Sequence, residues 1–294
     1  MRILHLDTGR EMRGGQHQAL MLMRLQRDAG HQVRLLAAAD SPLLEQAQRE
    51  DFEAGWIAWP AVRICGRQTD VTHCHDARSH TLAAMWSSAP FVVSRRVAFP
   101  VKDGFLSRWK YRKAAMYLAV SEHVGQVLCA ADVPAAKIAI VPDAVDLAPE
   151  SSDFTGGAVA IQSGDPGKGV ELLRETGVPV AFSRDLQHDL QHARVFAYAS
   201  ALEGLGSAAL LAMSYGVPVV ASRVGGLPET IVDGVTGLVV DNTAAAFRGA
   251  ISHLLENEAL ARQMGLAGRD RVAAHFSPQR MLDGTLTAYN QVIA

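Results

Sequence analysis

A single acidic residue, Glu203, stands between an apolar run and a turn with two glycines, in the sequence SALEGLGSAALLAMS of residues 200–214. Residues 195–198 are β-branched and aromatic, and the residues after Ser207 are rich in Ala, Leu and Met, so the pattern predicts a strand, a tight loop and a helix. Such a loop directs unpaired backbone N–H groups and the positive end of the helix dipole at one point. We therefore expect a phosphate or a cluster of sugar hydroxyls to bind there. The alternative is that Glu203 only caps the helix.

Two histidines, His73 and His75, alternate at the end of another predicted strand, and Asp76 follows them. Alternation along a strand places both imidazoles on one face. Such a pair is either part of an active site or a pair of core histidines with satisfied hydrogen bonds, and the sequence favours neither reading. His17 and Gln18 begin the first predicted helix, where polar residues are common, so an ordinary helix start is the favoured reading for them.

Basic residues are concentrated between residues 95 and 113, where seven of them stand with one acid and four aromatic residues. Such a mix suits an anionic bilayer surface or a phosphorylated acceptor, and it is also the pattern of an exposed helix whose basic side chains snorkel. Arg95 and Arg96 follow a predicted buried strand, and we expect the two guanidinium groups to grip a phosphate together. The cluster is short and matches no nucleic-acid-binding module, so we expect no nucleic-acid partner.

The composition is that of an ordinary globular protein. Of 294 residues, 49% are hydrophobic and 20% charged, and a net charge of −2 provides no general attraction to nucleic acid or anionic membranes. No apolar run approaches the ~18 residues of a membrane helix, and the first residues lack the apolar region of a secretory signal, so we expect a soluble cytoplasmic protein. The cysteines Cys65, Cys74 and Cys129 match no metal pattern and are expected to be free thiols.

Strands and helices alternate along the chain. RILHLD is followed by a Gly-Gly turn, a helix and a second strand, and the same β-α-β pattern returns in residues 70–96 and 115–147. After a polar segment, 148–157, which we interpret as a linker, five short strands follow: AVAIQSG, VPVAFS, ARVFAYAS, VPVVAS and GLVV. This alternation predicts an α/β protein with two Rossmann-like, doubly wound parallel sheets. We expect one domain over residues 1–148 and one over 149–294.

Six stretches resemble the retaining, family-4-like group of GT-B glycosyltransferases, and the resemblance spans nearly the whole chain. They are RGGQHQAL, DVTHCHDARSH, LAVSEHV, AADVPAAKIAIVPDAVDL, EGLGSAALLAMSYGVPVVASRVGGLPETIVDGVTGLVV and HFSPQRM. The fifth is the most specific, because its glycines, prolines and acids fall in the family's order. The resemblance implies two domains facing across a cleft, with the acceptor bound by the first and the donor by the second. It also implies that the last helix, about 278–294, crosses back to the first domain.

The resemblance implies roles for individual residues of the donor site. Glu203 would meet hydroxyls of the transferred sugar, and Lys168 matches the family's lysine that pairs with donor phosphate, although a lysine in a Gly-rich turn can also be merely solvated. Gly14 and Gly15 would let the backbone approach the same phosphates, because a Cβ there would obstruct it. The backbone expected to hold the donor diphosphate is that of Gly204, Leu205, Gly206 and Ser207.

For the other residues the resemblance implies a catalytic part for His73 together with Glu203 and Lys168. Contacts to the acceptor or its phosphate are expected from Arg95, Arg96, His75 and Asp76.

The reaction implied by the resemblance is transfer of a sugar from a nucleotide-sugar to a cell-surface glycan or lipid-linked acceptor, as in lipopolysaccharide biosynthesis. Fixed N–H dipoles and Lys168 would stabilise the departing diphosphate, so neither a metal ion nor a cofactor is expected. The anomeric configuration would be retained through front-face attack, without a protein nucleophile. Peripheral contact with the cytoplasmic face of the inner membrane through residues 95–113 is part of this expectation.

The sequence departs from the family at several positions. Leu211 stands where relatives carry a second glutamate that contacts the ribose, and Ser163 stands where they carry an arginine. Residues 158–193 are shorter than the family segment, which indicates a trimmed second domain, and Arg95 and Arg96 follow the strand where many relatives have a histidine. These departures leave two alternatives open. One is a non-catalytic sugar-nucleotide-binding or scaffold protein of the same fold, and the other is a nucleotide-sugar epimerase.

Overall fold

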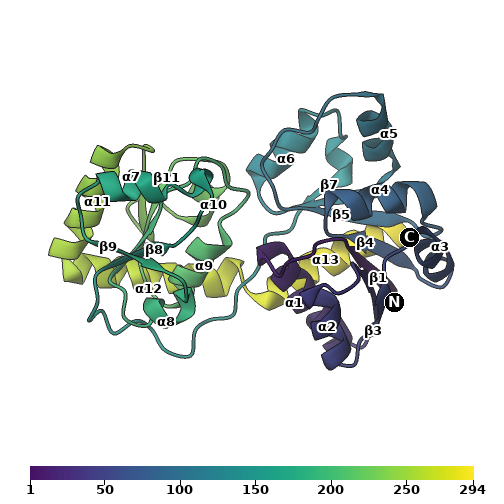
Figure 1. The fold of residues 1–294 in the computed structure, drawn as a ribbon, viewed down its shortest axis with the longest axis horizontal. Coiled ribbons are helices and arrows are strands. Elements are labelled where there is room, and N and C mark those ends of the chain that lie inside the picture. The colour runs from purple at the N-terminus through teal and green to yellow at the C-terminus, as the bar shows by residue number, and fades with distance from the viewer. The chain divides into compact units, whose positions relative to one another are not determined.

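The computed structural model describes residues 1–294, and the chain divides into two compact units (Figure 1). The N-unit consists of Met1–Asp143 and Pro278–Ala294, and the C-unit of Ala144–Ser277. The boundary thus lies at 143/144 rather than at 148/149. None of the helices combines the length and the apolar character needed to cross a bilayer.

The N-unit is built on a seven-stranded sheet with the order β3-β2-β1-β4-β5-β6-β7, in which all neighbours are parallel. Its strands are β1 (Arg2–Asp7), β2 (Gln32–Ala37), β3 (Glu53–Trp56), β4 (Val71–Cys74), β5 (Phe91–Arg95), β6 (Met116–Ala119) and β7 (Ile138–Ile140). Its helices are α1 (Gly14–Asp28), α2 (Pro42–Arg49), α3 (Trp59–Gly66), α4 (Ala77–Trp86), α5 (Phe105–Lys113), α6 (Glu122–Cys129), the 3₁₀ turn η1 (Ala135–Lys137) and α13 (Pro278–Ile293). The strand order reverses between β1 and β4, and such a switch point opens a crevice at the strand ends.

The C-unit is built on a smaller parallel sheet of five strands with the order β12-β11-β10-β8-β9. Its strands are β8 (Ala158–Ile161), β9 (Val180–Ser183), β10 (Val195–Tyr198), β11 (Val219–Ser222) and β12 (Gly237–Val240). Its helices are η2 (Pro166–Lys168), α7 (Val170–Glu175), α8 (Leu186–Leu190), α9 (Ser207–Ser214), α10 (Leu227–Thr230), α11 (Ala244–Glu256) and α12 (Glu258–His275). The order reverses between β8 and β10, so the loops after these two strands border the switch point.

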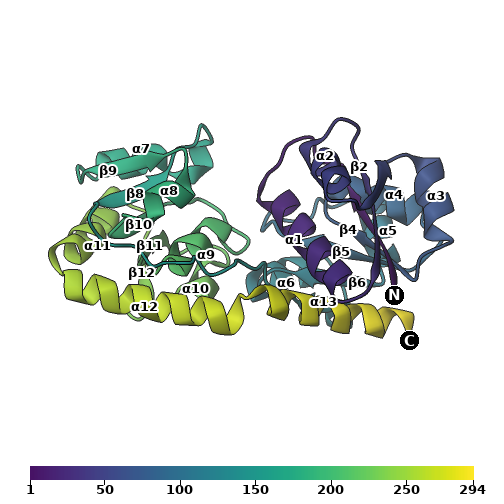
Figure 2. The same ribbon diagram turned by 90° about the horizontal axis from the view of Figure 1, so that it is seen from below.

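Helix α13 returns the end of the chain to the N-unit, where it lies beside α1 (Figure 2). Its buried residues recur at the spacing of one helical face. They are Met281, Leu282, Thr285, Ala288 and Tyr289. The chain segment that is last in sequence thus contributes a fully buried tyrosine to the core of the first unit.

Candidate functional site

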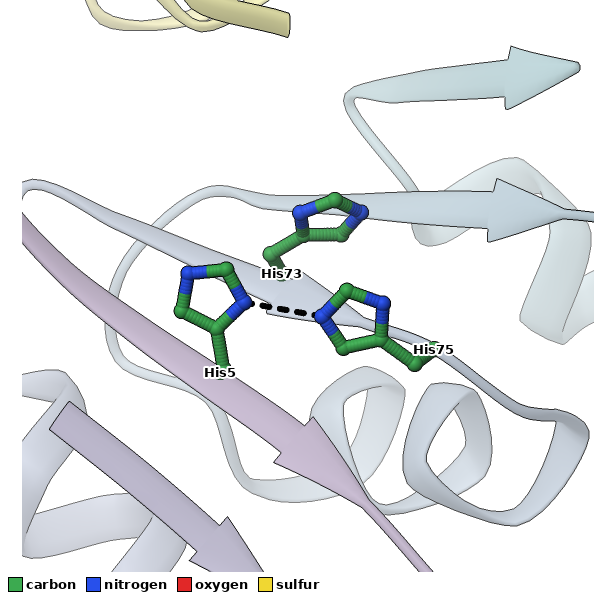
Figure 3. Close-up of side chains that lie close together, drawn as sticks. All are labelled: His5, His73 and His75. Atoms are coloured by element: carbon green, nitrogen blue, oxygen red, sulfur yellow. Dashed lines mark hydrogen bonds between the residues drawn. The ribbon is translucent and has the colours of Figure 1, made fainter. Parts of the chain in front are cut away.

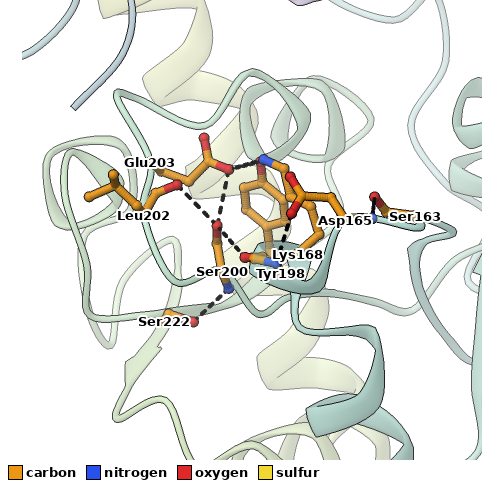
Figure 4. Close-up of polar contacts among 9 residues, drawn as sticks. Ser163, Asp165, Lys168, Tyr198, Ser200, Leu202, Glu203 and Ser222 are labelled. Atoms are coloured by element: carbon orange, nitrogen blue, oxygen red, sulfur yellow. Dashed lines mark hydrogen bonds and ion pairs between the residues drawn. The ribbon is translucent and has the colours of Figure 1, made fainter. Parts of the chain in front are cut away.

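An ion pair between Lys168 and Glu203 lies at the switch point of the C-unit sheet (Figure 4). Oε1 of Glu203 also accepts hydrogen bonds from the hydroxyl of Tyr198 at 2.8 Å and from Oγ of Ser200 at 3.2 Å. The Lys168 side chain is 32% exposed and that of Glu203 12%. The pair therefore lies at a place that water and ligands reach.

Three glycines make this arrangement possible, because each lets one loop lie directly against another. Gly169 has φ +61°, and a Cβ there would lie 2.6 Å from Cβ of Ala199, which follows β10. This close approach brings Lys168 to the end of β10. Gly206 has φ +99° and would meet Leu227, while a Cβ on Gly225 would clash with the carbonyl of Glu203. The absence of a Cβ at these three glycines therefore lets the loops pack directly against one another.

Helix α9 begins at Ser207 with Gly206 as its N-cap residue, and no side chain caps it. The carboxylate of Glu203 is instead directed at Lys168, Tyr198 and Ser200, so the alternative in which Glu203 caps the helix is wrong. The first turn also contains no acidic residue. Backbone N–H groups at such a helix start suit a phosphate oxygen. Of the predicted diphosphate-binding residues, Gly204, Leu205 and Gly206 are buried and Ser207 is exposed.

At two of the positions where the sequence departs from the family pattern, Leu211 and Ser163, the charged side chain of the family is absent. Leu211 is half-buried on α9, one turn after Ser207 and hence on the same helix face. Its side chain offers no acceptor for a ribose hydroxyl. Oγ of Ser163 accepts a hydrogen bond from the amide of Asp165 at 3.1 Å, which shapes the turn before Lys168.

The N-unit holds a different cluster at its own switch point, made by His5, His73 and His75 (Figure 3). His5 of β1 lies opposite His73 of β4 in the parallel register, and Nδ1 of His5 is 2.8 Å from Nε2 of His75. His5 and His73 are fully buried and His75 is 7% exposed. His5 is a residue of this cluster that the sequence analysis missed, since only the β1–β4 register reveals it.

The hydrogen-bond roles in this cluster follow from Arg96, which can only donate. Nη1 of Arg96 lies 3.3 Å from Nδ1 of His75, so that nitrogen accepts. His75 must then carry its proton on Nε2 and donate to Nδ1 of His5. His5 in turn donates from Nε2 to Oε1 of Gln26 at 2.7 Å.

The chain of donors continues to the C-terminal helix and back to β5. The amide of Gln26 donates to the hydroxyl of Tyr289 at 3.3 Å, and that hydroxyl lies 2.6 Å from Nδ1 of His73. If the Tyr289 hydroxyl donates to Nδ1, then Nε2 of His73 donates to Oγ of Ser94 at 2.8 Å. This assignment gives each of the three imidazole N–H groups an acceptor, as buried polar groups require.

All three imidazoles are neutral. Burial lowers the pKa of His5 to about 4 and is the main cause that places the pKa of His73 and of His75 well below the ordinary range. One nitrogen of each histidine lies within 4.8 Å of one nitrogen of each of the others, a spacing that could suit a metal ion, yet all six ring nitrogens already have hydrogen-bond partners. His73 is enclosed by its own unit, so the expectation that it contacts substrate as a catalytic residue is not supported. Its position is that of a satisfied core histidine.

Two carboxylates stand beside the histidines. Burial and the neighbouring Asp76 raise the pKa of Asp7 to about 6, although the amide of Gly9 donates to it at 2.7 Å. Asp7 ends β1 and was not singled out from the sequence. Asp76 caps α4 and also accepts hydrogen bonds from the amide and hydroxyl of Thr8. Because these partners occupy both of its oxygens, Asp76 is not a group that is free to bind an acceptor.

Arg95 and Arg96 do not grip one phosphate, contrary to the expectation. They are consecutive at the end of an extended strand, and such side chains point to opposite faces. Arg96 donates to Asp143 at 2.8 Å and lies against Gly15, whose Cβ would be 3.9 Å from its Cδ. Arg95 instead donates to the carbonyl of Phe99.

At the start of α1, Gly14 is exposed and Gly15 half-buried, and beyond them His17 is exposed and Gln18 buried. The three cysteines are free, as expected.

Two family models match the chain and together span most of it. Residues 12–149 match Glycosyltransferase Family 4, and residues 174–271 match Glycosyl transferases group 1.

Curated relatives are similar over parts of the chain. Alpha-maltose-1-phosphate synthase of Mycolicibacterium smegmatis is 33% identical over 197 residues, which are 65% of this chain and 48% of that protein. The GDP-mannose-dependent alpha-(1-6)-phosphatidylinositol monomannoside mannosyltransferase of the same species is 52% identical over 69 residues, 23% of this chain and 18% of that protein. The chain spans about half of the length, or less, of the curated relatives that it matches.

Solved structures of the same fold cover nearly the whole chain. Anabaena HepE in complex with UDP has a TM-score of 0.89 at 14% identity, over 99% of this chain and 100% of that one. Sucrose-phosphate synthase from Thermosynechococcus elongatus has a TM-score of 0.77 at 16% identity, over 99% of both chains. The prediction of two Rossmann-like parallel-sheet domains is thereby confirmed.

Proposed function

Since the chain belongs to the family-4 type of glycosyltransferases with the GT-B fold, we propose that it is a retaining, metal-independent enzyme that transfers a sugar from a nucleotide-sugar donor. The observation that carries the proposal is the Lys168–Glu203 pair beside the uncapped start of α9. This constellation combines a partly exposed cation, fixed N–H dipoles and a carboxylate at one switch point.

Each group has a part in the proposed reaction. When the anomeric C–O bond breaks, its electron pair leaves with the diphosphate, whose growing negative charge Lys168 and the N–H groups of α9 stabilise. Lys168 exchanges its contact with Glu203 for one with phosphate. Glu203 then accepts hydrogen bonds from sugar hydroxyls, while Tyr198 and Ser200 hold its orientation. The acceptor hydroxyl forms the new C–O bond on the face that the diphosphate leaves and passes its proton to the departing phosphate, so the scheme requires no cofactor and no protein nucleophile.

The identity of the nucleotide is the next part of the proposal. HepE has been solved with UDP and with UDP-glucose, and one relative is named as GDP-mannose-dependent. We therefore take UDP- and GDP-sugars as the first donor candidates. Because Leu211 offers the ribose no acceptor, the nucleotide is bound mainly through its diphosphate and the backbone.

The acceptor is proposed to bind to the N-unit and to be a cell-surface glycan or lipid-linked intermediate, such as one of lipopolysaccharide biosynthesis. Residues 95–113 support contact with a membrane, because Phe99, Phe105 and Leu106 are exposed among basic residues. Apolar and basic side chains together favour an anionic bilayer surface. We place the enzyme at the cytoplasmic face of the inner membrane.

A thermal-shift panel of UDP-, GDP-, ADP- and CMP-sugars tests the proposal. A donor at ~100 times its Kd stabilises the protein by about 2.7 kcal/mol, which raises Tm by several degrees. Lys168→Ala should remove this shift. Its matched control is Arg174→Ala, which deletes a cation of an exposed pair with Glu171 in the same unit. Absence of a shift with every nucleotide-sugar would overturn the proposal.

Leu211 specifically favours a second candidate function, that of a non-catalytic protein which binds sugar nucleotides. Such a protein would show the thermal shift without transfer or donor hydrolysis. The epimerase alternative is separated from both by its product, an isomerised nucleotide-sugar.

A further inference from the structure

A pocket of about 660 Å³ lies in the N-unit where the end of β5 and residues 97–102 meet α4 and α5. Its volume is in the range of small-molecule sites. Much of its wall is apolar, and several of these side chains are more than 40% exposed. They are Met85, Val97, Phe99 and Leu106.

The cations of this pocket have no carboxylate partner. Arg95, Lys102 and Lys110 line it together with no acidic residue. Arg95 forms no ion pair, and its Nε is buried without any hydrogen-bond partner. Two other arginines of this region do have carboxylate partners, because Arg96 pairs with Asp143 and Arg108 pairs with Asp103.

Lys110 adds a second positive charge that is only weakly compensated. Its Nζ reaches the carbonyl of Ala77 and the hydroxyl of Thr81, both at 3.4 Å. Burial and the neighbouring Arg95 lower the pKa of Lys110. Two cations that repel each other in an apolar surrounding are stabilised by an anion placed between them.

We propose that this pocket binds the phosphate and the adjoining apolar chain of a lipid-linked acceptor. The proposal deepens the proposed function and rests on it for the role of the ligand, while the binding itself can be measured without a donor. Arg95 and Lys110 contact the phosphate, and the apolar wall, with Leu106 at its rim, contacts the lipid chain.

The pocket on the other side of α5 is a less suitable place for such a ligand. It has a volume of about 400 Å³ and shares Lys102 with the first pocket, but Asp103 and Asp132 line it. Carboxylates repel a phosphate, so charge complementarity selects the pocket that contains Arg95.

Calorimetric titration of the full chain with monomeric farnesyl phosphate, farnesol and inorganic phosphate tests the proposal. Farnesyl phosphate should bind at least ~10-fold more tightly than either of its parts, because it alone offers both contacts. Arg95→Gln should weaken farnesyl phosphate binding by about 10-fold and leave farnesol binding unchanged. Equal binding of farnesyl phosphate and farnesol would overturn the proposal.

Two matched substitutions separate the pocket from the outer surface of α5. Leu106→Asp places a charge at the pocket rim and should abolish binding, whereas Phe105→Asp changes an exposed neighbour outside the pocket and should not affect it. Arg108→Gln is the corresponding control for Arg95→Gln. If Phe105→Asp weakens binding of the monomeric ligand as much as Leu106→Asp does, the ligand adheres to the surface and the pocket proposal is wrong.

Two further experiments use lipid vesicles and nucleotide-sugar donors. Vesicles that contain a polyprenyl phosphate should bind the chain more tightly than vesicles with the same fraction of a general anionic phospholipid, and equal binding contradicts the proposal. A thermal shift with nucleotide-sugars reports on the C-unit and on the folding of each variant. Loss of that shift with intact farnesyl phosphate binding counts against the proposed transferase function alone.

Discussion

The polar clusters at the two switch points are of opposite kinds. In the N-unit three neutral imidazoles are enclosed, and each nitrogen has a partner. In the C-unit Lys168 and Glu203 form a partly exposed ion pair, in which one carboxylate oxygen of Glu203 accepts three hydrogen bonds. Removal of water favours the neutral form of a group, whereas partial exposure lets a charged pair persist.

This difference indicates different uses. A closed network with assigned donors fixes the geometry of its members, and here it holds Arg96 between His75 and Asp143. A half-exposed ion pair can exchange one partner for a ligand. We therefore expect substitutions in the C-unit cluster to act on turnover and those in the N-unit cluster to act on stability.

Glu203→Ala is expected to have the largest effect. Transfer or donor hydrolysis should fall at least ~100-fold, the scale of the loss of one preorganised polar contact. Steady-state kinetics with the donor found in the thermal-shift panel measure it. Glu171→Ala removes an exposed carboxylate of the same unit and is the control. Unchanged turnover in Glu203→Ala would contradict a catalytic role of the C-unit cluster.

The pH dependence of stability should separate the units. Burial lowers the pKa of His31 and, more strongly, that of four buried N-unit histidines, so the unfolded state binds more protons than the folded state below about pH 6.5 and stability is lost as pH falls. They are His5, His73, His75 and His80. The raised pKa of Asp7, about 6, acts in the opposite direction, because its contribution is lost as pH rises.

The histidines outnumber this acid, so the N-unit should lose roughly 3 to 4 kcal/mol between pH 7 and pH 5.5. Hydrogen exchange in the full chain measures both units at once. The four histidines of the C-unit are exposed, so its protection should change far less. Equal loss of hydrogen-exchange protection in both units would show that the buried imidazoles do not determine how the stability of the two units depends on pH.

Tyr289→Phe should destabilise the N-unit by about 1 to 3 kcal/mol, because Gln26 and His73 each lose a buried partner. Chemical denaturation measures the change in the free energy of unfolding. Tyr215→Phe is the control, since no hydrogen bond of the Tyr215 hydroxyl is present in the structure. A Tyr289→Phe protein as stable as its parent would contradict the assigned network.

Leu211→Glu should have the smallest effect, a gain of about 10-fold in nucleotide-sugar affinity from one charge-assisted hydrogen bond to the ribose. Leu211→Ala, which adds no acceptor, is the matched control. Calorimetric titration with the donor measures both variants. If Leu211→Glu does not improve nucleotide-sugar affinity, a ribose contact is not what the C-unit site lacks at this position.

The sequence predicted the scaffold of the C-unit site well because its signals are local. All five strands of the second sheet were expected, and Glu203 and its glycines lie within one short stretch. The resemblance alone placed Lys168 in the same donor site as Glu203, 35 positions away, and their ion pair was not predicted. Tyr198 and Ser200 were missed, although their place at the end of a predicted strand just before Glu203 is a usable signal.

The N-unit cluster was predicted only in part because its contacts are not local. His5 meets the other histidines through the β1–β4 register, and Tyr289 reaches His73 across 216 positions. The sequence could have predicted that Arg95 and Arg96 point to opposite faces, because successive side chains of a strand alternate. The sequence predicted no helix or strand for residues 42–66. The edge strand β3 in this segment is half-exposed and lacks an apolar pattern.

The return of α13 also makes the N-unit discontinuous in the chain, whereas the C-unit is one continuous segment. We therefore expect Ala144–Ser277 to fold when expressed alone. Met1–Asp143 expressed alone lacks the helix that packs against β4, β6 and β7, and His73 there lacks its phenolic partner. A split of the chain at the unit boundary should therefore leave only the C-unit as a stable fragment.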